Sequence, residues 1–181
     1  MAEKNDAVAP SVKRFAAILY RKLEWLQQSL ERLRGPFGPL DFRGPARRFD
    51  FTDFYAAEMG TDLSRGLVGF TRLTEPPFLV EAKWTARAIE TELAGERGRR
   101  VNIDVGYLDL FKVVLASFKG RGNKLYLGRE VWADITLTYG KGRFQPLPWS
   151  FPDFKAGTYD DDLLELRRIY KAELKRGGAD I

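Results

Sequence analysis

Apolar and polar positions along the chain predict strands and helices in turn. The apolar run Val12–Tyr20 predicts a first strand. Four leucines recur every three or four residues over Leu23–Leu33, the stripe of an amphipathic helix that Gly35 and Pro36 would end. Leu40–Phe49 predicts a second strand, and we expect it at a sheet edge because a Gly-Pro pair interrupts it.

The middle of the chain predicts a further strand and a longer helix. Phe49–Gly60 is typical of a turn that leads into a short helix, and Arg65–Leu73 is typical of a third strand. Thr74 is placed to cap a helix whose first turn tolerates the two prolines that follow. Apolar residues at helical spacing over Leu79–Leu93 give this helix a buried stripe, and Gly95 is placed to end it.

Beyond this helix the pattern predicts a strand, a short helix and a hairpin. Arg100–Val105 predicts a fourth strand. Apolar residues at helical spacing over Leu108–Phe118 predict a short helix, although Val113–Leu115 would also suit a strand. Lys124–Gly128 and Val131–Tyr139 predict a hairpin, with alternate residues of the second arm, from Val131 to Leu137, on one face.

The C-terminal part predicts one more strand, a covering segment and a helix. A glycine-rich turn at Gly140–Gly142 leads into a strand at Arg143–Leu147. Pro146–Phe154 is rich in proline and aromatic residues, and we expect it to lie across the core. Leu163–Leu174 has the spacing of a final helix, and Asp160–Asp162 suit its positive N-terminal end.

This order of elements predicts an α+β fold. We expect a mostly antiparallel sheet with helices packed on one face, a ferredoxin-like β-α-β-β-α-β core, and a C-terminal meander and helix. The absence of repeats and linkers in the sequence predicts a single domain over residues 11–175, with flexible termini at residues 1–10 and 176–181.

Composition favours a globular protein. Hydrophobic residues make up 44% of the 181 positions, enough to bury a core. The longest apolar run, Phe15–Tyr20, is far shorter than the ~18 residues that a membrane span needs, so we expect no membrane partner. The polar N-terminus lacks the pattern of a signal peptide, which predicts a cytoplasmic location.

The chain contains no cysteine and no histidine. Thiolate nucleophiles, histidine bases and Ser-His-Asp triads are therefore excluded. No zinc, haem or iron–sulfur site is expected, because these sites take cysteine or histidine ligands. A metal held by the protein alone would be a hard ion on oxygen ligands, magnesium being the candidate cofactor.

The net charge of +5 favours an anionic partner. Nucleotides, phosphorylated metabolites and nucleic acid all belong to this class. Because 25 acidic residues offset 30 basic ones, the excess is moderate, and the composition on balance speaks against a nucleic-acid partner.

Three stretches carry a resemblance to a known family. They are Phe49–Tyr55 with Glu58–Gly60, Arg100–Leu108 with Val114–Ser117, and Leu125–Gly128 with Val131–Leu137 and Pro146–Phe154. Over Lys13–Leu174 the chain resembles the uncharacterised bacterial domain-of-unknown-function family 4416. Members of that family are sometimes labelled GTP-binding proteins, so the resemblance implies a nucleotide such as GTP as a ligand to test.

The sequence contains none of the standard nucleotide motifs. Neither the phosphate loop G-x-x-x-x-G-K-[ST] nor the dinucleotide motif G-x-G-x-x-G occurs, and Gly120–Lys124 lacks the required spacing. Asn123-Lys124 resembles the start of a guanine-reading Asn-Lys-x-Asp, but Tyr126 stands where the acid belongs. The chain also departs from the family pattern, which has His-Arg at positions 123–124 and Pro at Val105.

A group of carboxylates is a candidate metal site. Asp50, Asp53 and Glu58 lie near a predicted helix start, where acids ordinarily cap or favour a helix. Alternatively, Asp50 and Asp53 join Asp104 or Asp134 to hold magnesium, since hard ions bind convergent oxygens. The magnesium hypothesis therefore names Asp50, Asp53 and Asp104.

Six residues are candidates for ligand binding, three at the end of a strand and three as a phosphate-binding patch. They are Asn102, Asp104 and Tyr107 at the strand end, and Arg100, Arg121 and Lys124 from a basic cluster that also contains Arg97, Arg99 and Lys119. Polar residues at a strand end often face a pocket, and Gly106 would allow a tight bend there. They equally serve to tie down a turn by local hydrogen bonds, and a run of charges is usually a solvated face.

Three functional hypotheses follow. The first is a module that binds a phosphate-bearing ligand, a nucleotide or RNA. The second is a magnesium-dependent enzyme acting on a phosphorylated substrate. The third is a protein-interaction module that uses Trp149, Phe151 and Phe154; these aromatics would otherwise stack on bases or pack on the core.

Overall fold

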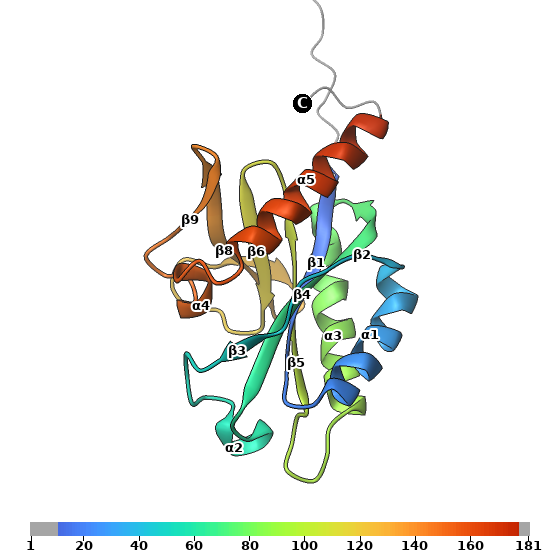
Figure 1. Cartoon of the computed structure of the whole chain (residues 1–181), viewed down its shortest axis with the longest axis vertical. Helices are drawn as coiled ribbons and strands as arrows, with labels where there is room; N and C mark the ends of the chain where they lie inside the picture. The colour runs from blue at the N-terminus through green and yellow to red at the C-terminus, as the bar shows by residue number, and fades with distance from the viewer. Residues whose placement is uncertain (1–10, 178–181) are drawn as a thin grey trace, which may run out of the picture.

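The computed structural model describes residues 11–177, and within them nine strands form one antiparallel sheet (Figure 1). The strands are β1 (Val12–Tyr20), β2 (Leu40–Arg43), β3 (Arg47–Phe49), β4 (Leu63–Thr74), β5 (Val101–Leu108), β6 (Lys112–Ser117), β7 (Leu125–Gly128), β8 (Val131–Gly140) and β9 (Arg143–Pro146). Their order is β2-β4-β1-β5-β6-β8-β7, with β3 beside β4 and β9 beside β8. The predicted mixed α+β fold with a large antiparallel sheet is confirmed.

Five α-helices and a 3₁₀ turn accompany the sheet in residues 11–177. They are α1 (Leu23–Phe37), α2 (Ala56–Met59), η1 (Pro76–Phe78), α3 (Leu79–Glu92), α4 (Pro152–Lys155) and α5 (Asp160–Arg176). None of these helices is long and apolar enough to cross a membrane. The predicted flexible segment 1–10 and most of 176–181 lie outside the described residues, and Arg176 closes α5.

Strand β1 is central, and every one of its nine residues is buried. It pairs antiparallel with β4 on one side and with β5 on the other. Ala16 and Ile18 belong to a core cluster shared with α1 and α3, whereas Phe15 and Ala17 belong to a cluster shared with α5. Successive side chains of a strand point to opposite faces, so both faces of the sheet must be covered.

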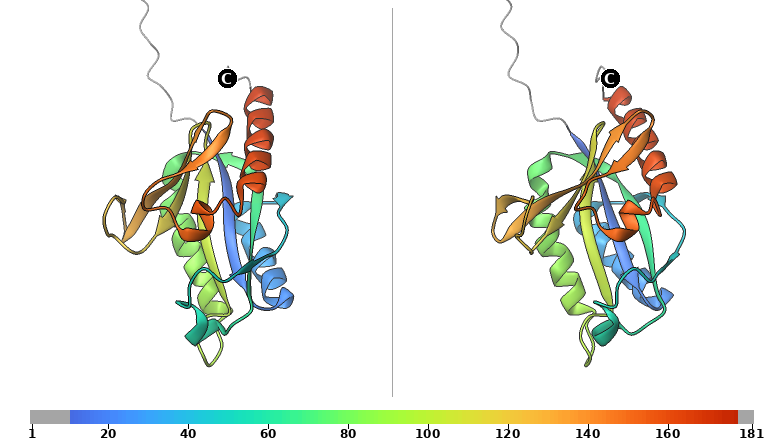
Figure 2. Two further views of the ribbon diagram at one scale, coloured as in Figure 1. Left: turned by 60° about the vertical axis from the view of Figure 1, so that its left-hand side comes forward. Right: turned by 90° about the vertical axis from the view of Figure 1, so that its left-hand side faces the viewer.

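Helices therefore lie on both faces, and the expectation that they share one face is wrong. Figure 2 shows α5 on the opposite side of the sheet from α3. Lys13 of β1 is fully buried and binds Glu173 of α5 at 2.9 Å, and it also contacts Asp41 of β2. This buried ion pair fixes α5 across the sheet.

The predicted short helix over Leu108–Phe118 is wrong, because β6 occupies Lys112–Ser117. The competing run of β-branched residues around Val114 decides the structure. It pairs with β5 and β8 on either side, so its hydrogen bonds come from neighbouring strands. The predicted alternation of the second hairpin arm, with Val131 and Leu137 on one face, is also interrupted. A register shift opposite Thr136 places Leu137 in the cluster under α5, whereas Val131 belongs to the cluster on the other face of the sheet.

Several element ends differ from their predictions. Helix α1 continues through Pro36 to Phe37, and Gly38, with φ of 89°, lies at its end. Proline fits there because the helix loses only one internal hydrogen bond in its last turn. Thr74 ends β4 and does not cap a helix, because η1 precedes α3. The Gly-Pro pair in Leu40–Phe49 divides that segment into two separate strands along β4.

Candidate functional site

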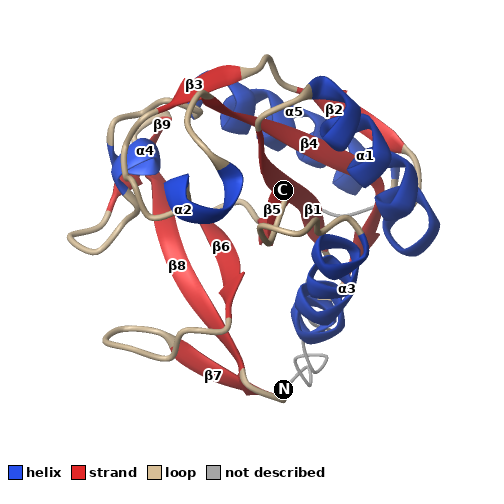
Figure 3. Ribbon diagram, turned by 90° about the horizontal axis from the view of Figure 1, so that it is seen from below, coloured by secondary structure: helices blue, strands red, loops and turns tan. Residues whose placement is uncertain are grey.

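The candidate site begins where strands β5 and β6 separate. β5 pairs with β1 along its whole length, but it pairs with β6 only through Gly106, Tyr107 and Leu108. A Cβ on Gly106 would lie 2.4 Å from the carbonyl oxygen of Val114, so glycine permits the close crossing of the two strands. Figure 3 shows β6 and β8 running away from β1 and β5, with α2 near the angle between them.

A cavity of about 740 Å³, here called the central cleft, fills this angle. Its walls come from the segment 49–58, from β4, α3, the N-terminal half of β5, β6, β8 and the segment 151–153. Both charged and aromatic side chains line it. The charged ones are Arg65, Lys83, Arg87, Arg99, Lys119 and Lys124, with Glu58, Glu90, Asp104, Asp134 and Asp153.

Side chains of helix α3 bind the backbone of β5 at Ile103, where β6 does not pair with it. The amide of Ile103 donates to Glu90 Oε1 at 2.6 Å, and Lys83 donates to the carbonyl oxygen of Ile103 at 3.4 Å. Both side chains are buried, and burial raises the pKa of Glu90. The cleft is therefore a gap in the sheet lined by side chains in place of a neighbouring strand.

Arg65 of β4 lies at the floor of the central cleft and is 5% exposed. Its guanidinium donates to Asp153 at 2.8 Å and to Asp104, and it lies 5.1 Å from the ring centre of Phe49. Burial opposes its charge, but the attraction of Asp104 and Asp153 outweighs burial and raises the pKa of Arg65. Among the described residues, its Nε has no hydrogen-bond partner although it is buried.

A second unpartnered atom lies on the opposite wall. Asp134 of β8 is 3% exposed, and its Oδ2 lies 3.3 Å from the ammonium of Lys124. Lys124 also donates to Ser117 Oγ at 3.0 Å. The other carboxylate oxygen, Asp134 Oδ1, is buried and has no partner among residues 11–177. Buried polar atoms without partners are costly. A hydrogen-bond acceptor for Arg65 Nε and a donor for Asp134 Oδ1 would therefore each stabilise the protein.

Aromatic rings and cations form the rim of the central cleft. Lys119 lies 4.1 Å from the ring centre of Phe54, and Lys124 lies 5.7 Å from that of Phe151. Phe54 is 59% exposed and Phe151 is 40% exposed, so each ring keeps accessible surface beside the lysine that lies over it. Burial raises the pKa of Tyr55, whose ring also lines the cleft, to about 12.

The structure brings three of the six predicted ligand residues into the central cleft. Asn102 donates to Asp104 at 3.0 Å, and both line the cleft together with Lys124. Tyr107 lies beyond the strand crossing and packs against Phe78. Its neighbour Gly106 serves the close approach of two strands and not the tight bend that the sequence suggested.

The other two predicted residues lie elsewhere. Arg100 stacks on Trp25 with its guanidinium 4.3 Å from the ring centre, in a neighbouring hollow. Arg121 is exposed in the loop before β7 and does not line the central cleft.

The predicted magnesium ligands are not brought together. Asp50 is exposed and lies 3.4 Å from Arg48, whereas Asp104 binds Arg65 within the cleft. Asp53 is exposed and does not line the cleft. Within residues 11–177, no group of three or more acidic side chains is placed to hold a metal ion.

Sequence reasoning missed the residues that hold the cleft together, above all Arg65, Lys83, Glu90 and Asp153. One signal was available. Lys83 and Glu90 are charged residues next to apolar helix positions, and both prove to be buried. A charge on a buried face needs a partner, and such a position is a reason to look for a site.

The aromatic segment before α4 divides its side chains between core and surface. Phe154 is 2% exposed and packs in the cluster under α5. Trp149 remains 44% exposed and donates to the carbonyl oxygen of Ile135 at 3.0 Å. Phe151 turns toward the central cleft.

Fold and site thus describe an antiparallel α+β protein with a charged, aromatic-rimmed cleft at a strand crossing. The family model for a domain of unknown function, DUF4416, matches residues 10–170, so the chain belongs to the DUF4416 family and the resemblance is confirmed. Neither the search of curated proteins nor that of solved structures gave a match.

The stretches that carry the family resemblance meet at the central cleft. Phe49–Tyr55 supplies rim aromatics, and Arg100–Leu108 supplies Asn102 and Asp104. The third stretch supplies Asp134 and Asp153 from positions far along the chain. Lys124 places a cation beside Asp134.

Proposed function

We propose that the chain binds a small phosphate-bearing ligand, a nucleotide in particular, in the central cleft. The observation that carries this proposal is Arg65, which lines the cleft and whose buried Nε has no hydrogen-bond acceptor among residues 11–177. Phosphate and carboxylate oxygens are the acceptors that a guanidinium binds best. Six cationic residues line the cleft against five acidic ones, a small excess that favours a negatively charged ligand.

The aromatic rim favours a ligand with a planar part. Phe54 and Phe151 are exposed rings beside cations, an arrangement that suits stacking of a base over an aromatic side chain. Asp134 Oδ1 would accept a hydrogen bond from an N–H group of such a base. A nucleotide combines the acceptor, the planar ring and the donor in one molecule.

Other sequence predictions keep the status of proposals. The strand order β2-β4-β1-β5 with α1 and α3 supports a ferredoxin-like interpretation of the first half of the chain. The cytoplasmic location remains a prediction of the sequence. GTP is one member of the ligand class proposed, and no feature of the cleft selects it over other nucleotides.

A thermal-shift screen tests the proposal. The purified chain is heated with nucleoside mono-, di- and triphosphates and with sugar phosphates, each with and without magnesium. A ligand at about 100 times its Kd stabilises the folded state by about 2.7 kcal/mol, which raises the Tm measurably. If no compound shifts the Tm, the chain is not a binder of small phosphate ligands.

Matched variants place the bound ligand in the central cleft. Phe54→Ala should weaken nucleotide binding by roughly 5- to 150-fold, the equivalent of about 1–3 kcal/mol for one base stack. Phe111→Ala removes a ring that is 69% exposed outside the cleft and should leave the Kd unchanged. Lys119→Gln should weaken binding by up to roughly fivefold, since an exposed charge pair contributes up to about 1 kcal/mol. Its control, Arg121→Gln, removes the same charge two residues away.

A further inference from the structure

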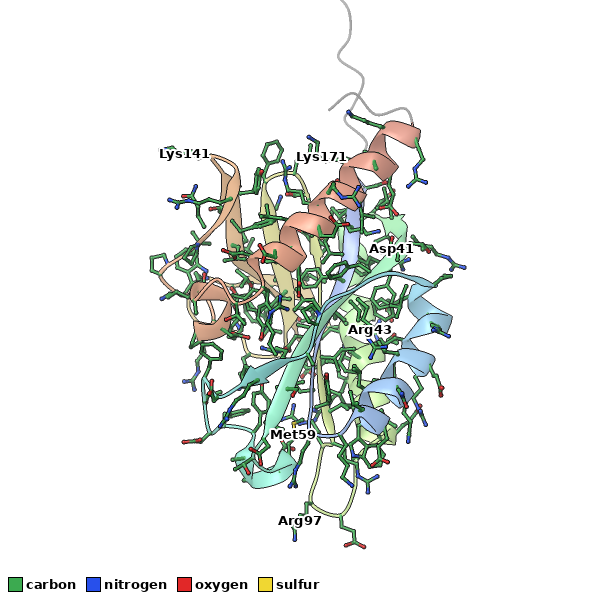
Figure 4. All side chains as sticks on the ribbon, viewed as in Figure 1. Asp41, Arg43, Met59, Arg97, Lys141 and Lys171 are labelled. Atoms are coloured by element: carbon green, nitrogen blue, oxygen red, sulfur yellow. The ribbon has the colours of Figure 1, made fainter. Side chains whose placement is uncertain are left out.

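A second cavity lies beside the central cleft, at the end of the molecule where Figure 4 labels Met59 and Arg97. This basic hollow has a volume of about 410 Å³ and lies between the start of α1, helix α2 and the loop 95–100. Five cations line it, against two acidic residues, Glu58 and Glu96. The cations are Arg21, Lys22, Arg97, Arg99 and Arg100.

Three of the five cations of the basic hollow are available to a ligand, unlike the paired cations deep in the central cleft. Arg21, Arg97 and Arg100 are exposed and form no ion pair with any residue in 11–177. Arg100 is held 4.3 Å from the ring centre of Trp25, so the hollow also contains a half-buried aromatic face. Unpaired arginines around an aromatic ring suit phosphates joined to bases.

The two cavities meet at one ion pair. Arg99 and Glu58 line both, and Arg99 Nε donates to Glu58 Oε1 at 3.0 Å. Arg99 also donates to Asn102 at 2.8 Å inside the central cleft. A ligand that passes this pair would contact unpaired cations on one side and the aromatic rim on the other.

We propose that the central cleft and the basic hollow together bind a single strand of nucleic acid, with one nucleotide in the cleft and the adjoining phosphates in the hollow. The proposal rests on the proposed function, because the cleft must first accept a nucleotide. A single strand is required, since bases in a duplex are stacked and paired and cannot enter a cleft to meet Phe54. An isolated nucleotide would leave the basic hollow without a counter-charge.

Fluorescence anisotropy with labelled RNA and DNA oligonucleotides of one to eight nucleotides tests this proposal. Affinity should rise by at least tenfold between one and four nucleotides. The slope of log K against log salt should become more negative by roughly 0.7 for each phosphate contact. Comparing RNA with DNA shows whether the 2′-hydroxyl contributes.

The double variant Arg97→Ala/Arg100→Ala should lose at least tenfold in oligonucleotide affinity and keep the mononucleotide affinity. Lys141→Ala/Arg143→Ala is the matched control, since it removes two exposed cations from the β8–β9 turn outside both cavities. Equal losses in both double variants would mean unspecific charge attraction and would overturn the proposal. Affinity that does not change with length overturns it too, but leaves nucleotide binding in place. If the unaltered chain binds no mononucleotide, the proposed function itself is contradicted.

Discussion

Arg65 shows how a single buried charge organises the central cleft. A lone guanidinium in a protein interior would be strongly unfavourable, and here two carboxylates compensate it. Tyr159 donates to Asp153 at 2.9 Å and fixes one of those carboxylates. Asp104 likewise accepts a hydrogen bond from Asn102, and Arg65 Nε is left without a partner among residues 11–177.

The stability cost of removing this charge is a first prediction. Arg65→Met leaves Asp104 and Asp153 without their cation, and it should lower the unfolding free energy by roughly 3–5 kcal/mol. The double variant Arg65→Met/Asp153→Asn should recover part of this loss, because it removes one uncompensated buried charge. Urea denaturation monitored by circular dichroism measures both values. A loss below 1 kcal/mol in the single variant would mean that the pair with Asp153 does not form.

At the scale of elements, a strand was predictable where its local apolar pattern fits a strand and not a helix. Val12–Tyr20 was predicted to the residue, because an apolar run with few helix signals becomes a fully buried central strand. The segment Lys112–Ser117 was not, because its apolar spacing fits a helix as well as a strand. Its pairing with β8, which lies later in the chain, decides between the two.

The site was predictable only in part for a related reason. Asn102 and Asp104 could be chosen from their place near a strand end, since such residues often face a pocket. Arg65 and Asp153 could not be paired from sequence, because 88 positions separate them and only the fold brings them together. Asp50 and Asp53 show the reverse case, in which closeness along the chain did not lead to a shared site.

The crossing of β5 and β6 gives a second prediction. Gly106→Ala places a Cβ against the Val114 carbonyl oxygen, a backbone atom that cannot move without shifting β6. We expect a loss of roughly 1–3 kcal/mol in unfolding free energy, as for other overpacked positions. Because the crossing shapes the central cleft, the variant should also weaken ligand binding.

Gly66→Ala is the control for this change. Gly66 is also a strand glycine, but its added Cβ would meet the nearest atom, the Pro45 carbonyl oxygen, at an ordinary 3.6 Å. The control should be neutral or slightly stabilising, since alanine reduces the entropy of the unfolded chain. Equal destabilisation by both variants would refute the role given to the strand crossing.

At the scale of the whole molecule, the narrow join between β5 and β6 raises the question of whether the two parts of the sheet unfold together. Only three residue pairs connect these strands. The cluster under α5 bridges the join, because it contains Phe15 of β1, Leu115 of β6 and Leu166 of α5 itself. Helix α5 thus connects the meander, strands β6–β9, to strand β1, and it is anchored to β1 a second time through Lys13.

The single domain over residues 11–175 stays a prediction of the sequence, and this bridging predicts one cooperative unfolding transition. Two of the four tryptophans, Trp25 and Trp84, lie on α1 and α3, whereas Trp132 lies on β8 and Trp149 follows β9. Urea transitions followed by tryptophan fluorescence and by far-ultraviolet circular dichroism should therefore coincide in midpoint and slope. If the meander formed a separate unit, Trp132 and Trp149 would report an earlier transition, and the variant Trp132→Phe/Trp149→Phe would abolish that phase alone. A cooperative transition would mean that the central cleft is built between parts that fold as one, so a ligand bound there stabilises the entire chain.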